Sequence, residues 1–380
     1  MKVIVACNPF KGSLDSVRAG RIIARALRDC IPGTTVDEVP IADGGDGTLN
    51  CLAEAVPSRR HRKKVPGPLG EPLQAQYLVY KERPAAVVEM ARASGLALLD
   101  DSERNPMKAT ALGTGLLIRA AMEKGCGDII VGIGGSATNE GGTGAASALG
   151  YRFLDARGKE LYPCGENLAR IRAIDASRVM PELKRTKITV ACDVTNPLLG
   201  PRGAAAVYAP QKGATPAQVK KLEAGLKQLA DVAEKSLGPD MRDMPGAGAA
   251  GGMGFGLVTF LGAELVSGID MMIRATGLEQ RLRGADLLIT GEGRMDEQSA
   301  HGKAPYGLLQ LARKHGVPAM AFCGSVAGEK ALHKAGFKAV IPIIPGPLDL
   351  DSAMRHAGDL LHRAVVRTAG LIALCAGKAD

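Results

Sequence analysis

Residues 128–149 read as a buried strand, a glycine-rich loop and a helix in direct succession. The stretch opens with the apolar, partly β-branched run DIIVGI and continues with GGSATNEGGTG, which carries almost no bulk. A short apolar run without alternation is typical of a strand that is covered on both faces of a parallel sheet. In such a sheet the loop after the strand lies at the carboxyl edge, where ligands bind. No other feature constrains the fold as strongly.

The same order of strand, polar glycine loop and helix recurs along the chain. Apolar strands are expected at residues 3–7, 36–41, 85–90, 188–192, 286–290, 318–323 and 339–344. An amphipathic helix is expected at 216–237 and a closing helix at 354–374. Alternating strands and helices predict an α/β protein with mainly parallel sheets. A chain of 380 residues has room for about two domains.

Two stretches break this pattern. Residues 57–72 are polar and basic and contain four prolines, so we expect a domain boundary there, and we expect the dense run RRHRKK at 59–64 to be a solvated connector. The run PGAGAAGGMG at 245–254 is open to two interpretations, which are a flexible linker and a backbone cradle for an anion.

Composition argues against several classes of function. Aromatic residues make up 3% of the chain and Trp is absent, so stacking platforms for nucleic acid are not expected. The 8 cysteines are scattered without CxxC spacing, which argues against disulfides and zinc sites and favours a reducing cytoplasm. We find neither a signal peptide nor an apolar run long enough to span a membrane, so no membrane partner is expected. The net charge of +9 suits small anionic substrates.

The loop at 134–144 has the composition of an anion site. Glycines let backbone N–H groups approach an anion, and the dipole of the next helix favours negative charge. It is not a Walker loop, because GxxxxGK[ST] does not occur. GxGxxA at 132–137 matches a loose dinucleotide fingerprint, with Asp155 near the place of the ribose-binding acid. Against it, NEGG at 139–142 breaks the expected helix and Glu140 repels a pyrophosphate. A tight turn without a ligand is the third interpretation.

Charged and polar side chains follow several other expected strands. Lys11 precedes a helix N-terminus, where it is placed to meet a phosphate, and Ser13 or Asp15 can cap that helix. Asp43 and Asp46 are separated by glycines and offer the hard oxygen ligands that Mg²⁺ takes. Ordinary turn aspartates are the alternative interpretation.

Two further loops carry such groups. Asp193 ends the strand expected at 188–192, and Pro197 holds Asn196 extended. After the strand expected at 286–290, residues 291–303 gather glutamate, arginine, aspartate, serine and lysine in what we expect to be a loop. This is not the composition of a core.

Five motifs together resemble the bacterial glycerate kinase family. They are NPFKGSL at 8–14, ADGGDGT at 42–48, GGSATN at 134–139, CDVTNPLLG at 192–200 and TGEGRMD at 290–296. They follow the family order and cover nearly the whole chain. Each motif is weak alone, but the set is highly specific. The family usually carries Asp where Asn8 stands, so Asn8 keeps a carbonyl ligand but brings no charge.

The resemblance implies transfer of the γ-phosphate of ATP to D-glycerate, usually at the 2-hydroxyl, with the 3-hydroxyl as the less favoured alternative. It also implies Mg²⁺ and two Rossmann- or flavodoxin-like α/β domains that face each other across a cleft. The first domain is discontinuous and comprises residues 1–65 and 275–380, and residues 66–274 form the inserted domain. We expect a cytoplasmic monomer or homodimer. Which domain holds ATP stays open.

The kinase hypothesis assigns a role to each candidate residue. Charge neutralisation of phosphates or of the substrate carboxylate falls to Lys11, Arg294 and Lys303, and Asp193 is the favoured general base. The metal candidates are Asp43, Asp46 and Glu292. The expected substrate contacts are Asn8, Ser13 and Asn196. The expected nucleotide contacts are Gly134, Gly135, Ser136, Thr138, Asn139, Gly141 and Gly142.

Two rival functions fit parts of the sequence. The loose fingerprint allows a nicotinamide-dependent hydroxy-acid dehydrogenase, and the loops alone allow a non-catalytic ligand-binding module. Thermal protection by MgATP but not by NADH would exclude the dehydrogenase. ADP release that depends on glycerate would exclude the binding module.

Overall fold

The computed structural model describes residues 1–10, 12–42, 47–300 and 304–376. The chain divides into two compact units. Unit 1 consists of Met1–Asp43, Asn50–Val56 and Gly268–Asp380, and unit 2 consists of Gly44–Leu49 and Pro57–Ser267. The domain boundaries expected from the sequence and the cleft between the domains stay predictions.

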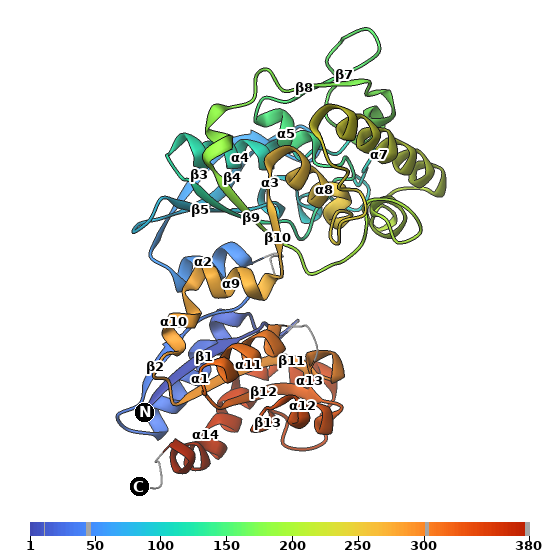
Figure 1. Cartoon of the computed structure of the whole chain (residues 1–380). Helices are drawn as coiled ribbons and strands as arrows, with labels where there is room; N and C mark the ends of the chain where they lie inside the picture. Colours follow the sequence, from blue (N-terminus) through green and yellow to red (C-terminus); the bar gives the residue numbers. More distant parts are fainter. Residues whose placement is uncertain (11, 43–46, 301–303, 377–380) are drawn as a thin grey trace. The chain divides into compact units, whose positions relative to one another are not determined.

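Unit 1 is built around a five-stranded sheet in the order β13-β12-β11-β1-β2, and every neighbouring pair is parallel. Both ends of the chain contribute, so the blue β1 lies beside the orange β11 (Figure 1). The strands are β1 (Lys2–Cys7), β2 (Thr35–Glu38), β11 (Leu287–Met295), β12 (Ala319–Val326) and β13 (Ala339–Pro342). The predicted parallel arrangement is confirmed.

The strand order of unit 1 reverses between β1 and β11. Counted along the chain, the five strands lie in the order 2-1-3-4-5, which is the flavodoxin-like order. In open sheets of this kind ligands bind outside the carboxyl ends of the strands, at the point where the order reverses. The residues that follow Cys7 and Gly291, which pair in register, therefore lie where a ligand is expected.

Helices pack on the sheet of unit 1 through small and aliphatic side chains. Asp15 caps α1, since its Oδ1 accepts from Arg18 N at 2.7 Å, which settles the choice between Ser13 and Asp15. The core is shared by α1, α14 and the strands. The helices are α1 (Ser16–Cys30), α2 (Thr48–Ala55, which begins in residues of unit 2), α9 (Gly268–Thr276), α10 (Leu278–Leu282), η5 (Glu297–Ala300), α11 (Ala304–Lys314), α12 (Glu329–Ala335), α13 (Leu350–Arg355) and α14 (Ala357–Ala376).

Unit 2 holds a six-stranded sheet in the order β10-β9-β6-β5-β4-β3. The first four strands of this order are parallel, and β4 and β3 join as antiparallel neighbours. The strands are β3 (Ser58–Pro66), β4 (Pro72–Tyr80), β5 (Ala85–Glu89), β6 (Asp128–Gly132), β9 (Lys187–Ala191) and β10 (Glu264–Val266), and β7 (Arg152–Leu154) pairs separately with β8 (Ala173–Asp175).

The basic run at 59–64 is a strand, so the expectation of a connector was wrong. It forms most of β3, the outermost strand, which pairs along its whole length with β4. Cross-strand bonds join backbone groups and do not depend on side-chain polarity, and exposed charges are common on edge strands because they discourage pairing with another chain. The two prolines Pro66 and Pro72 lie at the ends of these strands.

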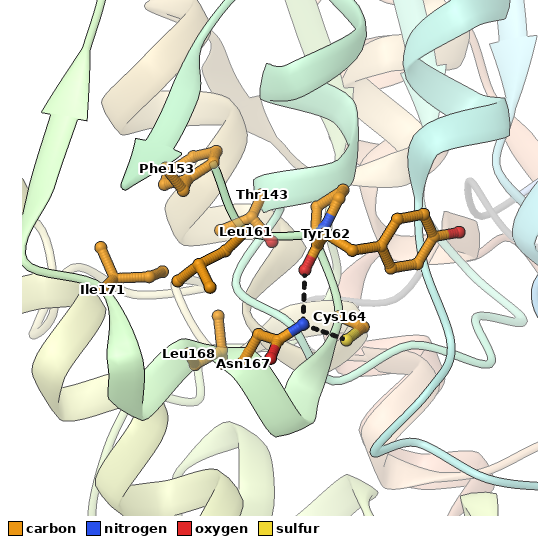
Figure 2. Close-up of a pocket in the computed structure, with 9 residues that line it drawn as sticks. Thr143, Phe153, Leu161, Tyr162, Cys164, Asn167, Leu168 and Ile171 are labelled. Carbon is orange, nitrogen blue, oxygen red and sulfur yellow. Dashed lines mark hydrogen bonds between the residues drawn. The ribbon is translucent and has the colours of Figure 1, made fainter. Parts of the chain in front are cut away.

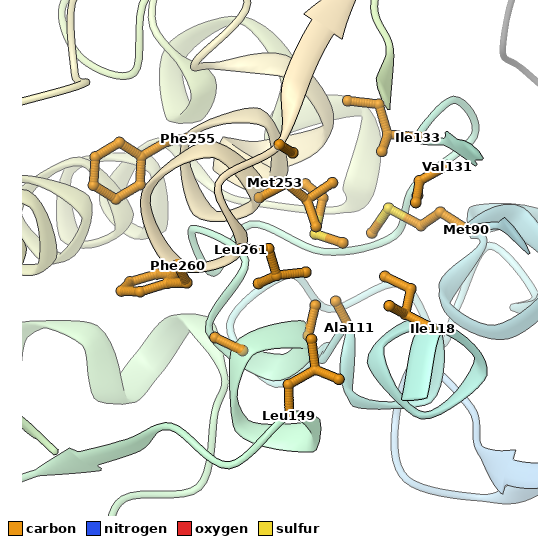
Figure 3. Close-up of a cluster of buried hydrophobic side chains, with 14 of the residues drawn as sticks. Met90, Ala111, Ile118, Val131, Ile133, Leu149, Met253, Phe255, Phe260 and Leu261 are labelled. Atoms are coloured by element: carbon orange, nitrogen blue, oxygen red, sulfur yellow. The ribbon is translucent and has the colours of Figure 1, made fainter. Parts of the chain in front are cut away.

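The helices of unit 2 cover a core in which α8 takes a central place. Figure 3 shows Met253 and Leu261 of α8 near Val131 of β6 and Met90. The helix expected at 216–237 is confirmed as α7, which begins with a Thr215–Gln218 capping box. The helices are α3 (Ala91–Ser94), η1 (Leu96–Leu98), α4 (Leu112–Glu123), α5 (Thr143–Ala148), η2 (Gly165–Arg170), η3 (Pro181–Arg185), α6 (Ala204–Tyr208), η4 (Pro210–Lys212), α7 (Pro216–Leu237) and α8 (Ala249–Leu261).

Candidate functional site

The glycine loop follows β6 at the carboxyl edge of the sheet of unit 2. It is mostly interior, because Thr138, Asn139 and Glu140 are at most 1% exposed. Only Gly135 is exposed, and Gly134 is half-buried. If the loop binds an anion, the anion therefore reaches it at the short segment Gly134–Ser136, where Gly134 and Gly135 are accessible and Ser136 is 7% exposed.

Backbone pairing holds this accessible segment in place. Leu96 N donates to Gly135 O at 2.7 Å, and Ala137 N donates to Ser94 O at 2.9 Å. These bonds form an isolated bridge between Ser136 and Gly95, next to α3 and η1. A glycine segment has little side-chain packing of its own, so these bonds supply the rigidity that it lacks.

The side chain of Lys212 contacts the loop from inside unit 2. The lysine is 2% exposed, and its Nζ donates to Ser136 Oγ at 2.8 Å and to Thr138 O at 2.6 Å. Burial lowers the pKa of Lys212 to about 7, and the charge of Glu140 partly opposes this shift. Nothing in the local sequence around Lys212 marks this base as buried.

Glu140 is used inside the protein. Its Oε2 accepts from Gly144 N at 2.8 Å and from the Thr143 hydroxyl, at the start of α5. Burial raises its pKa to about 7, and these hydrogen bonds partly oppose the shift. Because the carboxylate is buried, it does not line the exposed part of the loop, where it would repel a phosphate.

The second half of the loop packs backbone against backbone on the glycine-dense run. A Cβ on Gly251 would lie 2.0 Å from Thr138 O, and a Cβ on Gly256 would lie 2.4 Å from Gly141 O. Gly141 N also donates to Gly251 O at 3.1 Å. The glycines at 245–254 are therefore neither a flexible linker nor an exposed anion cradle, and both interpretations were wrong. The nucleotide contacts expected at Gly141 and Gly142 stay predictions, and a phosphate contact by Gly141 N–H would have to replace this bond.

The loop after β9 combines an exposed acid with a fixed amide. Asp193 is exposed two residues beyond the end of the strand. Asn196 Oδ1 accepts from Tyr208 O–H at 2.8 Å, and its Nδ2 donates to Arg202 O at 2.7 Å. Both ends of the Asn196 amide thus have partners within unit 2, so a substrate contact through this side chain would have to share or replace them.

Glu89 is a positioning group that sequence reasoning did not identify. It ends β5, is fully buried, and accepts from Gly47 N at 3.0 Å and from Leu49 N at 3.1 Å. The carboxylate thereby binds the N-terminal turn of α2, where the ADGGDGT motif ends. An acid at the end of the apolar run AAVVE was the only available signal.

The edge of unit 1 presents charged side chains from a strand. Glu292 and Arg294 belong to β11, so the expectation that they lie in a loop was wrong: the ladder with β12 continues through both. Glu292 Oε1 accepts from the buried Ser299 hydroxyl. The Arg294 side chain is 71% exposed, with its Nε 3.7 Å from Asp296 Oδ2.

Asn8 and Glu292 each follow the last pair of the β1–β11 ladder, Cys7 and Gly291, at the point where the strand order reverses. Asn8 N donates to Gly291 O at 2.8 Å and so belongs to the bonds of that last pair. Asn8 Oδ1 is buried and has no hydrogen-bond partner among the described residues. Ser13 is engaged locally, since its hydroxyl donates to Phe10 O at 2.9 Å.

Asn8 and Glu292 supply some of the oxygen donors that a magnesium ion needs. Lys11, Asp43, Asp46 and Lys303 lie outside the described residues. Within the described ranges no group of three or more His, Cys, Asp and Glu side chains is arranged to hold a metal. Mg²⁺, however, commonly takes one or two carboxylates with waters and substrate phosphates. The unpartnered Asn8 oxygen and the Glu292 carboxylate are oxygen donors of that kind.

A small pocket in unit 2 lies at η2 and the end of the β7 hairpin. Its cavity volume is about 10 Å³, far below the roughly 300–1,000 Å³ of typical ligand pockets. Figure 2 shows Asn167 directed at Tyr162 O and Cys164 Sγ, to which its Nδ2 donates at 3.0 and 3.3 Å. We assign no substrate to this pocket.

The dinucleotide interpretation loses its two supports. The helix after the loop begins only at Thr143, well beyond the fingerprint at 132–137. Asp155 closes a turn, because its Oδ1 accepts from Arg157 N at 2.9 Å and from Lys159 N at 3.0 Å. An acid used in this way is a turn residue.

The structure also describes the state of the cysteines and the character of the helices. All seven cysteines whose side chains the structure describes are free thiols. Across the described ranges, no helix combines the length and the apolar character needed to cross a membrane.

Comparison with known proteins covers both units. A profile of the glycerate kinase family matches residues 3–373. The chain is 44% identical to the glycerate kinase of Bacillus subtilis (strain 168) and 42% identical to the glycerate 2-kinase of Escherichia coli (strain K12), in each case over 98% of both chains. A crystal structure named for glycerate kinase 2 of Salmonella typhimurium LT2 superposes with a TM-score of 0.88 at 40% identity, over 98% of both chains. The chain belongs to the glycerate kinase family.

Proposed function

We propose that the protein transfers the γ-phosphate of ATP to the 2-hydroxyl of D-glycerate and so forms 2-phosphoglycerate. The observation that carries this proposal is the full-length similarity to proteins named glycerate kinase and glycerate 2-kinase, which extends over both sheet edges. The 2-hydroxyl is preferred to the 3-hydroxyl because the Escherichia coli relative is named a 2-kinase.

Phosphoryl transfer depends on alignment and charge neutralisation more than on covalent chemistry. Arg294 suits this role because its guanidinium is exposed, always charged and able to bind a phosphate or carboxylate through two parallel hydrogen bonds. Lys11 and Lys303 are proposed for the same task. The Gly134–Ser136 segment is proposed to meet a nucleotide phosphate through its backbone.

Asp193 is the proposed general base for the attacking hydroxyl. It is exposed at the end of β9, so a substrate can reach it. Asp193→Asn keeps the shape but removes the base, and we expect turnover to fall by roughly 10²–10⁴-fold while the Kd for ATP changes little. Steady-state kinetics and calorimetric titration with ATP test this, and unchanged turnover would remove Asp193 from the role.

Mg²⁺ is proposed as the cofactor, with Asn8 and Glu292 as ligands together with Asp43 and Asp46. When bound, the ion would neutralise phosphate charge. Ser299 orients Glu292 through its hydroxyl, and Asn8 offers an oxygen that has no other partner in the described part of the chain. A cytoplasmic monomer or homodimer also remains part of this proposal.

The deciding experiment is ³¹P NMR of the protein with MgATP and D-glycerate. We expect the ATP resonances to be replaced by those of ADP and by a phosphomonoester whose coupling to a single proton identifies the 2-hydroxyl. Coupling to two protons would show 3-phosphoglycerate and correct the regiochemistry. If ADP and a new ester both fail to form, glycerate is not the substrate.

A further inference from the structure

Lys212 is a buried base that the proposed reaction has not yet used. It lies on η4, 76 residues away from Ser136 in sequence, and its head group contacts the accessible segment of the glycine loop. Lysine is almost never fully buried unless its head group is paired, because removing an ammonium from water is costly. Backbone pairing with Ser94 and Leu96 already holds the loop, so rigidity alone does not require a charge there.

The directions of the hydrogen bonds define what Ser136 can do. Thr138 O is a carbonyl and only accepts, so one N–H of Lys212 points to it. In its protonated form Lys212 only donates, so Ser136 Oγ accepts a second N–H from it. In this form the hydroxyl proton of Ser136 must point away from Lys212. Within the described ranges, no hydrogen bond is found in which this hydroxyl donates.

We propose that Lys212 is a positioning residue that orients the Ser136 hydroxyl as a hydrogen-bond donor to an anionic group of a substrate. The anion is a nucleotide phosphate or the glycerate carboxylate, an identification that rests on the proposed function. The donor lies next to exposed Gly135, where an anion can approach. Lys212 itself, at 2% exposure, acts through Ser136 and not by contact.

The test compares Ser136→Ala, Lys212→Met and the double variant. We expect each single change to lower kcat/KM by roughly 10- to 100-fold, since a donor aimed at substrate charge is lost or left unoriented. Because Lys212 acts through Ser136, the kcat/KM of the double variant should lie within about twofold of that of the less active single variant. A purely structural Lys212 would instead lower activity independently, and the two losses would multiply.

The matched control is Thr114→Val. Thr114 is a fully buried hydroxyl that bonds only to Ser94 Oγ in the described chain, at 2.9 Å, in the same wall. The change removes a hydroxyl without touching Ser136 or Lys212, so kcat/KM should stay within about twofold of wild type.

Binding experiments identify the anion without turnover. Calorimetric titrations of wild type and Ser136→Ala use a non-hydrolysable ATP analogue and D-glycerate as separate probes. Weaker binding of the analogue alone assigns the hydroxyl to a phosphate, and weaker binding of glycerate alone assigns it to the carboxylate. Unchanged affinity for both probes together with unchanged kcat/KM would overturn the proposal, as would multiplicative losses in the double variant.

The outcome stays clear if one protein fails. Should Lys212→Met not fold, Ser136→Ala still decides whether the hydroxyl contacts an anion, and full activity of that variant overturns the proposal. Should wild type not phosphorylate glycerate, the proposed function fails, while titration with the ATP analogue and with inorganic phosphate still tests the donor role of Ser136.

Discussion

The glycine loop of unit 2 and the strand β11 of unit 1 differ in how far their polar side chains are exposed, although both lie at the carboxyl edge of a parallel sheet. At the edge of unit 2 the polar groups of the glycine loop are interior: Thr138, Asn139, Glu140 and Lys212 are each at most 2% exposed. At the edge of unit 1 the Arg294 side chain is 71% exposed. The glycine loop after β6 presents backbone, and β11 presents a charged side chain.

The difference follows from how each edge is made rigid. A strand such as β11 fixes its side chains by the ladder itself, so Arg294 can extend into solvent without help from its neighbours. The glycine loop has no such ladder, and separate backbone bonds to Ser94, Leu96 and Gly251 hold it instead. These bonds and the close packing of the loop put its polar side chains inside unit 2, whereas the ladder of β11 leaves a charged side chain available in unit 1. Four changes test this contrast.

The largest effect is expected from Gly256→Ala. The new Cβ would lie 2.4 Å from Gly141 O and 2.6 Å from Gly142 Cα, and both are backbone atoms that cannot rotate away. We expect a loss of more than about 3 kcal/mol in the free energy of unfolding, with loss of activity. Urea unfolding followed by circular dichroism measures this. Gly127→Ala is the control, because its Cβ would meet nothing within 4 Å. Equal stability of the two variants would contradict the packing argument.

Arg294→Gln should separate activity from stability. Removing an exposed charge at the edge of unit 1 should change the free energy of unfolding by less than about 0.5 kcal/mol. If the guanidinium neutralises substrate charge, kcat/KM should fall by roughly 100-fold, or about 2.7 kcal/mol. Kinetics and urea unfolding of the same preparation check both halves. A destabilised variant would show that the two edges do not differ as described.

Glu140→Gln should change how the free energy of unfolding depends on pH, because the Glu140 carboxyl is buried. Burial raises the pKa of Glu140 from 4.5 to about 7, so its protonated form contributes stability that is fully present below pH 4.5 and is lost as pH rises through about 7. Glutamine does not titrate. Relative to wild type, the variant should therefore gain on the order of 2–3 kcal/mol between pH 4.5 and 8. Urea unfolding across this range measures the difference, and a difference that does not vary with pH would place the Glu140 carboxyl in water.

The smallest effect is expected from Ser299→Ala. This change removes the donor to Glu292 Oε1 and leaves the strand intact. We expect kcat/KM to fall by about 10-fold, or about 1.4 kcal/mol, with a higher Mg²⁺ requirement if Glu292 is a ligand. Activity measured against Mg²⁺ concentration tests this. Full activity at limiting Mg²⁺ would show that Glu292 needs no orienting group.

Sequence reasoning worked where a pattern is local. Apolar runs located the strands β1, β5, β6 and β9, and helical spacing located α7 with its correct ends. It failed at β3, where the six basic residues at 59–64 form a strand because β4 pairs with them. It also failed at Glu292 and Arg294, because the length of a ladder depends on the neighbouring strand as well as on the segment itself.

The sequence by itself determined the class of the fold, the order of most of its parallel strands and the family, because five motifs and the strand runs are properties of contiguous residues. Only the tertiary structure decided which polar groups are inside. Lys212 meets Ser136 across 76 residues, and Gly256 meets Gly141 backbone to backbone. Such contacts depend on how distant segments approach one another, and neither periodicity nor composition encodes that distance.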